Sequence, residues 1–186
     1  DALEKEYGVL LPVIANDATI ASRLVGIGVI AKDKAYELGA VGPTAKGSGL
    51  AMDLRQTGYA AYGQLDFKPI VQTGGDAYAR TMVRALEVVQ SINLVREAIE
   101  KIPVGDISVP VKGAPSGEVA ARIEQPRGEL IFYFKGNGTK NLERFKARTP
   151  TFANIVPLLH MLPGCQLADV PVIVLSIDPC ISCTER

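Results

Sequence analysis

Two cysteines near the end of the chain are the residues best suited to chemistry. Residues 178–183 read DPCISC, so Cys180 and Cys183 are separated by two residues. Two thiolates at this spacing can chelate one soft metal ion. A single Cys-x-x-Cys pair is equally compatible with half of a zinc site, with a redox pair, or with chance. The spacing alone leaves these alternatives open.

A rigidly framed arginine is the second candidate. Arg127 lies between Pro126, which fixes its own backbone angle, and Gly128, which permits a tight turn. An arginine held in this way can project its guanidinium to a fixed point. The alternative interpretation is a surface arginine that pairs with Glu124 or Glu129.

The third candidate is the start of a helix at residues 148–154, which read RTPTFAN. Pro150 and Thr151 lie where a strand is predicted to end and a helix, capped by threonine, to begin. Exposed N–H groups at such a terminus favour anionic ligands. An ordinary capped helix explains the same residues.

Apolar periodicity predicts the helices that must position these groups. Residues 75–102 carry apolar side chains at intervals of three and four, and Pro103 ends the pattern, which indicates one long amphipathic helix. Further helices are predicted for residues 17–31, 33–38 and 151–162. The segment 168–177 is apolar throughout, so periodicity does not decide between a helix and a buried strand.

Two strands follow the long helix. Residues 128–135 and 141–148 read as strands, and the intervening GNGTKN supplies a turn. The Gly- and Pro-rich residues 39–49 have apolar flanks, so we expect an ordered internal loop there. The predicted fold class is therefore α+β, mainly helical, with one long amphipathic helix and a small antiparallel hairpin.

Composition limits the class of protein. The 186 residues suffice for one domain, and 47% hydrophobic with 22% charged residues is typical of a globular chain. Lysine plus arginine and aspartate plus glutamate each number 20, so there is no basic excess and no nucleic-acid partner is expected. No apolar run approaches the roughly 20 residues that span a bilayer. Three cysteines do not form a disulfide framework.

The segments taken together resemble a known family. GPTAKGSG at 42–49, DLR at 53–55, PRGEL at 126–130, and LADV leading to SIDP at 167–179 are similar to the large subunit of energy-converting, membrane-bound nickel–iron hydrogenases of the Ech-like group. That group is similar to the 49-kDa-type subunit of respiratory complex I. The resemblance implies a hydrogenase large-subunit-like fold with a helix at 168–177.

The terminal cysteines separate the two families, because complex I subunits lack them. The complete pair favours a hydrogenase. The alternatives are a non-catalytic, complex I-like quinone-site or coupling subunit, and a structural zinc-binding protein. Uptake hydrogenases have His where this chain has Arg186.

The resemblance also implies roles for the candidate residues. Cys180 would be a terminal nickel ligand, and Cys183 would bridge nickel and an iron that carries CO and cyanide. Arg127 would lie over the open metal position, with Asp178 orienting it. Thr151 and the N–H groups after Pro150 would hydrogen-bond a cyanide.

A nickel centre of this type needs four thiolates, and this chain supplies two. The resemblance therefore implies that residues 1–186 are the C-terminal part of a large-subunit domain whose upstream half carries another Cys-x-x-Cys. It further implies an iron–sulfur small subunit with its clusters, membrane subunits of the same complex, and ferredoxin as electron partner. The expected location is the cytoplasmic face of the cell membrane, as a peripheral subunit.

Overall fold

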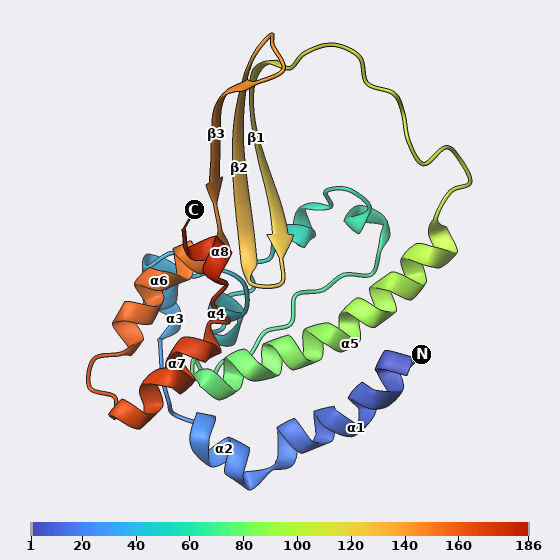
Figure 1. Cartoon of the computed structure of the whole chain (residues 1–186). Helices are drawn as coiled ribbons and strands as arrows, with labels where there is room; N and C mark the ends of the chain where they lie inside the picture. Colours follow the sequence, from blue (N-terminus) through green and yellow to red (C-terminus); the bar gives the residue numbers. More distant parts are fainter. Residues whose placement is uncertain (1, 186) are drawn as a thin grey trace.

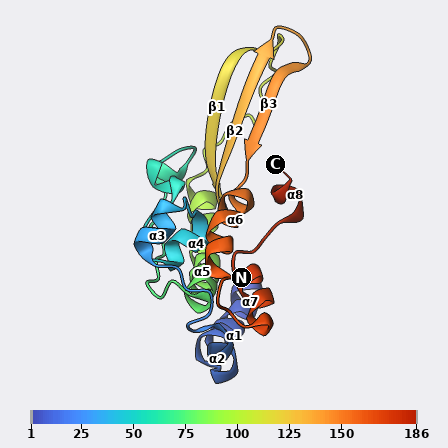
Figure 2. The same ribbon diagram turned by 90° about the vertical axis from the view of Figure 1, so that its left-hand side faces the viewer.

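A helical body carries a three-stranded antiparallel sheet that projects from it (Figures 1 and 2). The computed structural model describes residues 2–185. The sheet stands with one end on the body, so the turn between its first two strands meets the helices. This arrangement agrees with the predicted α+β class.

The longest helix, α5 (Ala77–Lys101), confirms the amphipathic helix predicted at 75–102. It begins at Asp76, whose Oδ1 accepts a hydrogen bond of 2.8 Å from the Ala79 amide. Helices α1 (Ala2–Asn16) and α2 (Ala18–Leu24) pack along it. The hydroxyl of Tyr7 donates to the carbonyl oxygen of Ala85 and ties α1 to α5.

The helix predicted at 17–31 is shorter than expected. It ends at Leu24, because Gly26 and Gly28 adopt φ values of 73° and 59°, which a helix does not allow. A Cβ at Gly28 would lie 3.0 Å from a side-chain atom of Ile173 and 3.1 Å from the Arg80 Nη2, so a larger residue there would have to displace these side chains. Helix α1 was not predicted from the sequence.

The segment expected to be an internal loop contains a buried helical turn. Helix α3 (Lys32–Glu37) is followed by Gly39 and then by α4 (Gly42–Gly47), in which every residue is buried. Two short 3-10 turns, η1 (Leu54–Thr57) and η2 (Tyr62–Gln64), lead to α5.

The sheet has the order β1-β2-β3, with β1 (Ser116–Gln125), β2 (Gly128–Asn137) and β3 (Leu142–Arg148). The predicted hairpin of β2 and β3 is confirmed, with Phe134 opposite Phe145. Strand β1 was not predicted from the sequence. It pairs with β2 in a register that places Gln125 opposite Gly128. The two residues between them form the turn that meets the body.

The C-terminal helices complete the core. They are α6 (Pro150–Met161), the 3-10 turn η3 (Leu167–Asp169), α7 (Val170–Ser176) and α8 (Ile181–Thr184), which confirms the helix implied for 168–177. Ile173 and Ile177 pack with Ile30 and Leu158, so segments far apart in sequence share one apolar cluster. Within residues 2–185, no helix combines the length and apolarity needed to cross a membrane.

Candidate metal centre

The turn between β1 and β2 directs Arg127 at the residue that precedes the cysteines. The Arg127 Nε donates to the carbonyl oxygen of Asp178 at 2.7 Å and lies 3.1 Å from its Oδ2. The Nη2 donates to Oδ1 at 3.3 Å. The structure therefore brings together two predicted site residues that are 51 positions apart. The alternative pairing is not found, because Glu124 accepts from the Leu54 amide and Glu129 pairs with Arg122 and Arg148.

Two glycines allow this turn to pack against α4. A Cβ on Gly42 would lie 2.3 Å from the Arg127 carbonyl oxygen, and one on Gly128 would lie 2.7 Å from the Gly42 nitrogen. Both contacts involve backbone atoms that cannot swing away. The side chain of Asn154 also bonds to the N–H and C=O of Val41, and so fixes α4 relative to α6. Arg127 thus projects from a turn whose backbone packs closely against the start of α4.

Asp178 has an unusual backbone conformation. Its φ is 53°, in the left-handed region, and it is not a glycine. Such a conformation costs on the order of 1–3 kcal/mol and persists where surrounding contacts impose it. Here its amide donates to the Leu175 carbonyl at 2.9 Å, while Arg127 holds both its carbonyl and its carboxylate. The strained residue redirects the chain from α7 toward the cysteines.

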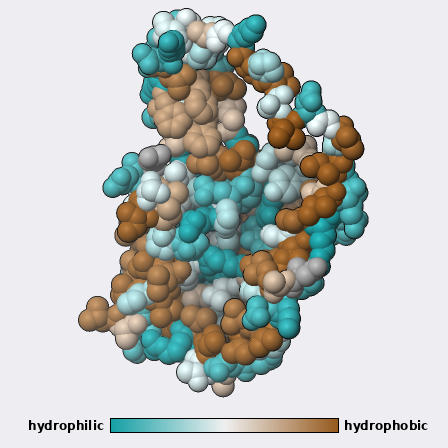
Figure 3. Space-filling view, turned by 45° about the vertical axis from the view of Figure 1, so that its right-hand side comes forward, coloured by the Kyte–Doolittle hydropathy of each residue, from teal (hydrophilic) through white to brown (hydrophobic). Residues whose placement is uncertain are grey.

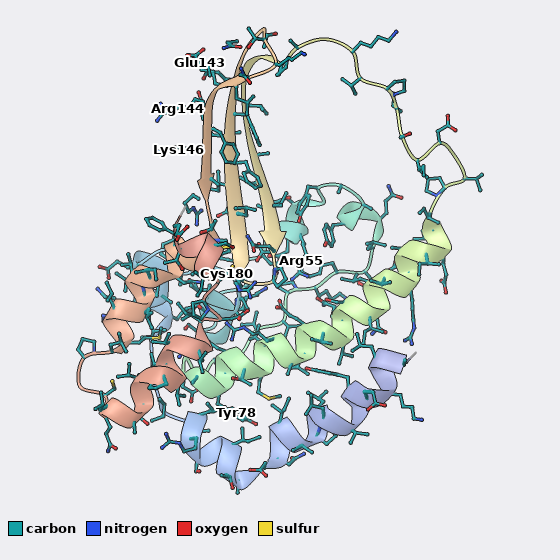
Figure 4. The ribbon with its side chains drawn as sticks, viewed as in Figure 1. Arg55, Tyr78, Glu143, Arg144, Lys146 and Cys180 are labelled. Atoms are coloured by element: carbon teal, nitrogen blue, oxygen red, sulfur yellow. The ribbon has the colours of Figure 1, made fainter. Side chains whose placement is uncertain are left out.

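Both cysteines are held by threonines at the start of α6. The amide of Cys180 donates to the fully buried Thr151 hydroxyl at 3.2 Å, and the hydroxyl of Thr149 donates to the Cys183 carbonyl. Pro150, the first residue of α6, is buried beside them. Figure 4 shows Cys180 where the foot of the sheet meets the helices. Pro150 and Thr151, predicted to bind a cofactor, therefore lie next to the cysteine pair.

The two thiols differ in acidity. A hydrogen-bonding contact of 3.2 Å with Ser182, bonds from Cys183, and the charge of Arg127 lower the pKa of Cys180 to about 7. Burial and the neighbouring Cys180 raise the pKa of Cys183. At neutral pH the pair can therefore hold one thiolate and one thiol.

The donor chemistry fits half of a four-thiolate centre. Cys180 and Cys183 are both free thiols, partly exposed, on the first turn of α8. Within residues 2–185 no group of three or more His, Cys, Asp or Glu side chains is placed to hold a metal ion. Cys165, the third cysteine, packs against the apolar core. Arg186 lies outside the described residues.

A buried ionic cluster beneath the sheet was not predicted from the sequence. The ammonium of Lys46, 1% exposed, pairs with Asp53 at 2.6 Å and with Glu87, and Arg55 pairs with the same two carboxylates. Burial raises the pKa of the nearby Glu124 to about 7. Lys46 and Asp53 belong to the segments GPTAKGSG and DLR, but the pairing of Lys46 with α5 spans 41 positions and has no local signal.

A groove of about 950 Å³ connects this cluster to the candidate centre. Its lining includes Glu87 and Glu124 as well as Arg84 and Asp178. Among the described residues, the Nε and Nη2 of Arg84 and the Oε1 of Glu124 are buried without a hydrogen-bond partner. Burial lowers the pKa of Arg84. Two of the residues that line the groove, Arg84 and Glu124, therefore carry buried polar atoms without partners, and the charge of Asp178 acts on Arg84.

Comparison with known proteins gives the family. The family described as "Respiratory-chain NADH dehydrogenase, 49 Kd subunit" matches residues 1–114 and 110–186. The chain is 45% identical to the "Carbon monoxide-induced hydrogenase" of Rhodospirillum rubrum, over 95% of this chain and 50% of that protein. It is 39% identical to the "Membrane-bound hydrogenase subunit alpha" of Pyrococcus furiosus, over 98% of this chain and 48% of that subunit.

The match extends to complex I-type subunits and to a solved structure. The chain is 40% identical to an NADH-quinone oxidoreductase subunit of Herpetosiphon aurantiacus, over 89% of this chain and 47% of that subunit. The structure superposes on a chain of the membrane-bound sulfane sulfur reductase, an archaeal respiratory membrane complex, with a TM-score of 0.92 and 32% identity. The superposition covers 100% of this chain and 52% of the other chain. The chain thus spans about half the length of the curated relatives it matches. Its relatives include proteins named as hydrogenases. The chain belongs to the family of the 49-kDa subunit of respiratory-chain NADH dehydrogenase.

Proposed function

We propose that this chain is the C-terminal part of the catalytic subunit of a membrane-bound nickel–iron hydrogenase. The reaction is the reversible formation and heterolysis of H2. The observation that carries the proposal is the convergence of Arg127, Asp178, Cys180 and Cys183 at one place in the fold. The similarity to two hydrogenase-named proteins supports it.

In this proposal Cys180 and Cys183 would hold a Ni-Fe centre, whose iron would carry CO and cyanide, with two of its four thiolates. When bound, the centre supplies the heterolytic chemistry of H2. The remaining two thiolates come from the upstream half of the large subunit. Soft thiolate sulfur is the donor that suits such a metal pair.

The chain's own residues then have distinct tasks. In this proposal the Cys180 sulfur is the atom that holds and releases a proton, and the hydrogen-bonding contact with Ser182 already lowers its pKa in the metal-free pair. Arg127 places a fixed positive charge beside it, and Asp178 orients the guanidinium through its carbonyl and carboxylate. The Thr151 hydroxyl oxygen accepts from the Cys180 amide, so its own hydrogen could donate to a cyanide of a bound centre, for which Pro150 and Thr151 are the candidate contacts.

The proposed partners follow from this role. Electrons exchange through an iron–sulfur small subunit, with ferredoxin as the external electron partner. Membrane subunits of the same complex hold the chain as a peripheral subunit at the cytoplasmic face. The similarity to a membrane-bound hydrogenase subunit and to a chain of a respiratory membrane complex supports membrane partners.

A second candidate is a complex I-like quinone-site or coupling subunit without metal. The 40% identity to an NADH-quinone oxidoreductase subunit favours it. A structural zinc site is the weaker alternative, because two cysteines are too few ligands for zinc without help. Metal content and H2 turnover distinguish the three.

The experiment is Arg127→Lys in the assembled complex. Lysine keeps the charge but loses the planar fork that bonds Asp178. We expect H2 turnover to fall about 100-fold, as for loss of one preorganised electrostatic group, while nickel content stays unchanged. Arg122→Lys is the matched control, since Arg122 lies exposed on β1 and pairs with Glu129. Normal turnover in the Arg127 variant contradicts the assigned role.

A further inference from the structure

Two cavities at the foot of the sheet share one carboxyl residue. The groove of about 950 Å³ has both Glu124 and Asp178 in its lining. A second cavity, of about 410 Å³, is lined by the start of α4, by residues around η1 and by β1, and its lining includes Asp53 and Arg122. Within residues 2–185, Glu124 is the one residue that lines both cavities. Figure 3 shows hydrophilic residues gathered below the sheet, where it meets the body.

Hydrogen bonds hold Glu124 in one orientation and leave one of its oxygens without a partner. Its N–H donates to the Tyr59 hydroxyl at 3.0 Å, and its Oε2 accepts from the Leu54 amide at 3.0 Å. Its Oε1 is buried without a hydrogen-bond partner among the described residues. A buried carboxylate oxygen that lacks a donor is unfavourable, and a proton on that oxygen removes the charge. The contacts therefore favour a proton on Oε1, and burial raises the pKa of Glu124 to about 7.

The charges around Glu124 are engaged with one another. Lys46 and Arg55 both pair with Asp53 and Glu87, and Glu129, which lies opposite Glu124 in the sheet, pairs with arginines of β1 and β3. None of these pairs includes Glu124, so no ion pair fixes it as a carboxylate. The charged and titratable groups around it are Lys46 of α4, Asp53, Arg55, Tyr59 and Tyr62 around η1 and η2, Arg84 and Glu87 of α5, and Arg122 and Glu129 of the sheet.

We propose that Glu124 is a proton-relay residue, which takes up a proton released by H2 heterolysis at the candidate centre and passes it to the cavity beside α4. The proton reaches Glu124 through the groove, which is large enough to hold water. Uptake forms the Oε1–H bond and neutralises the carboxylate, and release breaks that bond and restores the carboxylate. No electron moves in either step, and H2 formation uses the same steps in reverse. The inference rests on the proposed function.

A purely structural role explains less of the geometry. An acceptor for the Leu54 amide accounts for Oε2 but not for the unpartnered Oε1, nor for the place of Glu124 in the linings of both cavities. Glu124→Gln separates the two roles, because glutamine keeps an acceptor for Leu54 but carries no exchangeable carboxyl proton. Glu118→Gln is the matched control, since Glu118 lies exposed on the same strand and bonds the Tyr133 hydroxyl.

The first measurement is infrared spectroscopy of the assembled complex, and it does not depend on H2 turnover. We expect a carboxyl C=O band that disappears as the pH rises through about 7, shifts on transfer to D2O, and is missing in Glu124→Gln but present in Glu118→Gln. A band that persists in Glu124→Gln belongs to another group and contradicts the inference. A band that does not shift in D2O also contradicts it, because it shows a carboxyl cut off from water, as when the rest of the subunit fills the groove.

The second measurement compares two reactions of H2 in the same complexes. Exchange between D2 and H2O requires protons to pass between the centre and solvent, whereas conversion of para-H2 to ortho-H2 requires only that the H–H bond break and re-form. We expect Glu124→Gln to lower the exchange rate at least about tenfold and to leave the conversion within about twofold of the wild type, while Glu118→Gln changes neither.

The outcomes of this comparison are distinct. An unchanged exchange rate in Glu124→Gln contradicts the relay. Equal losses of exchange and conversion also contradict it, because they identify a structural role. A wild-type complex that converts no para-H2 refutes the proposed function instead, and the infrared result then still decides whether Glu124 exchanges protons with water.

Discussion

Replacing Glu124 by glutamine should change the pH dependence of the chain's stability. The Glu124 Oε2 accepts from the Leu54 amide at 3.0 Å, while its Oε1 is buried without a partner among the described residues. Burial disfavours the carboxylate and raises its pKa to about 7. The folded state therefore holds the proton more tightly than the unfolded state does.

The direction of this pKa shift determines whether the chain gains or loses stability as the pH rises. The contribution of Glu124 to stability is complete below its ordinary pKa of 4.5 and is lost as the pH rises through about 7. A rise from 4.5 to about 7 corresponds to roughly 3 kcal/mol at most, and partial solvent contact reduces this. Glutamine keeps an acceptor for Leu54 but cannot ionise. The variant should therefore gain free energy of unfolding relative to the wild type between pH 5 and pH 8, by about 1–3 kcal/mol.

Urea unfolding of both proteins at pH 5 and pH 8 measures this gain. Glu100→Gln is the matched control, because Glu100 lies exposed on the same chain and should show no comparable change. The reasoning would be refuted if the free energies of unfolding of the Glu124 variant and the wild type differed by the same amount at both pH values.

Three further substitutions probe the framework of the candidate centre. Lys46→Met should destabilise the fold by about 3–5 kcal/mol in urea unfolding, because it leaves two buried carboxylates without their ammonium; a change below about 1 kcal/mol contradicts the importance of the cluster. Gly128→Ala should displace Arg127 and lower H2 turnover at least about tenfold, because the added Cβ meets the backbone of Gly42. Gly138→Ala is the control, since Gly138 also has a positive φ but open space around it, and it should leave turnover unchanged. Equal losses of turnover in the two variants would count against the backbone contact. Thr151→Val leaves the part-buried Cys180 amide without its acceptor and should cost about 0.5–1.5 kcal/mol in the same unfolding assay. An unchanged midpoint would argue against that bond.

The sequence predicted features whose signals are local. The helix α5 repeats its apolar residues along its whole length, and β2 and β3 are separated by a clear turn sequence. By contrast, β1 exposes most of its residues on both faces, so it lacks the alternation that marks a half-buried strand. Helix α4 contains two glycines and a proline, which act against a helix until burial between α5 and the sheet imposes one.

The candidate centre was predictable in its residues but not in its surroundings. Arg127 and the cysteines stand out because proline, glycine and Cys-x-x-Cys are visible in sequence. The left-handed Asp178 and the high pKa of Glu124 arise from contacts between distant segments. No local pattern of residues encodes such contacts, so only the folded chain reveals them.

The most direct test of the central claim is the metal content of the complete large subunit in its assembled complex. Elemental analysis of the wild type should find nickel and iron at about one each per chain, and Cys180→Ser or Cys183→Ser should remove the nickel, as expected when one of four thiolate ligands is lost. Cys165→Ser, at the partly buried third cysteine, should leave it in place. Zinc, an absence of metal in the wild type, or nickel that persists in both ligand variants would contradict the central claim.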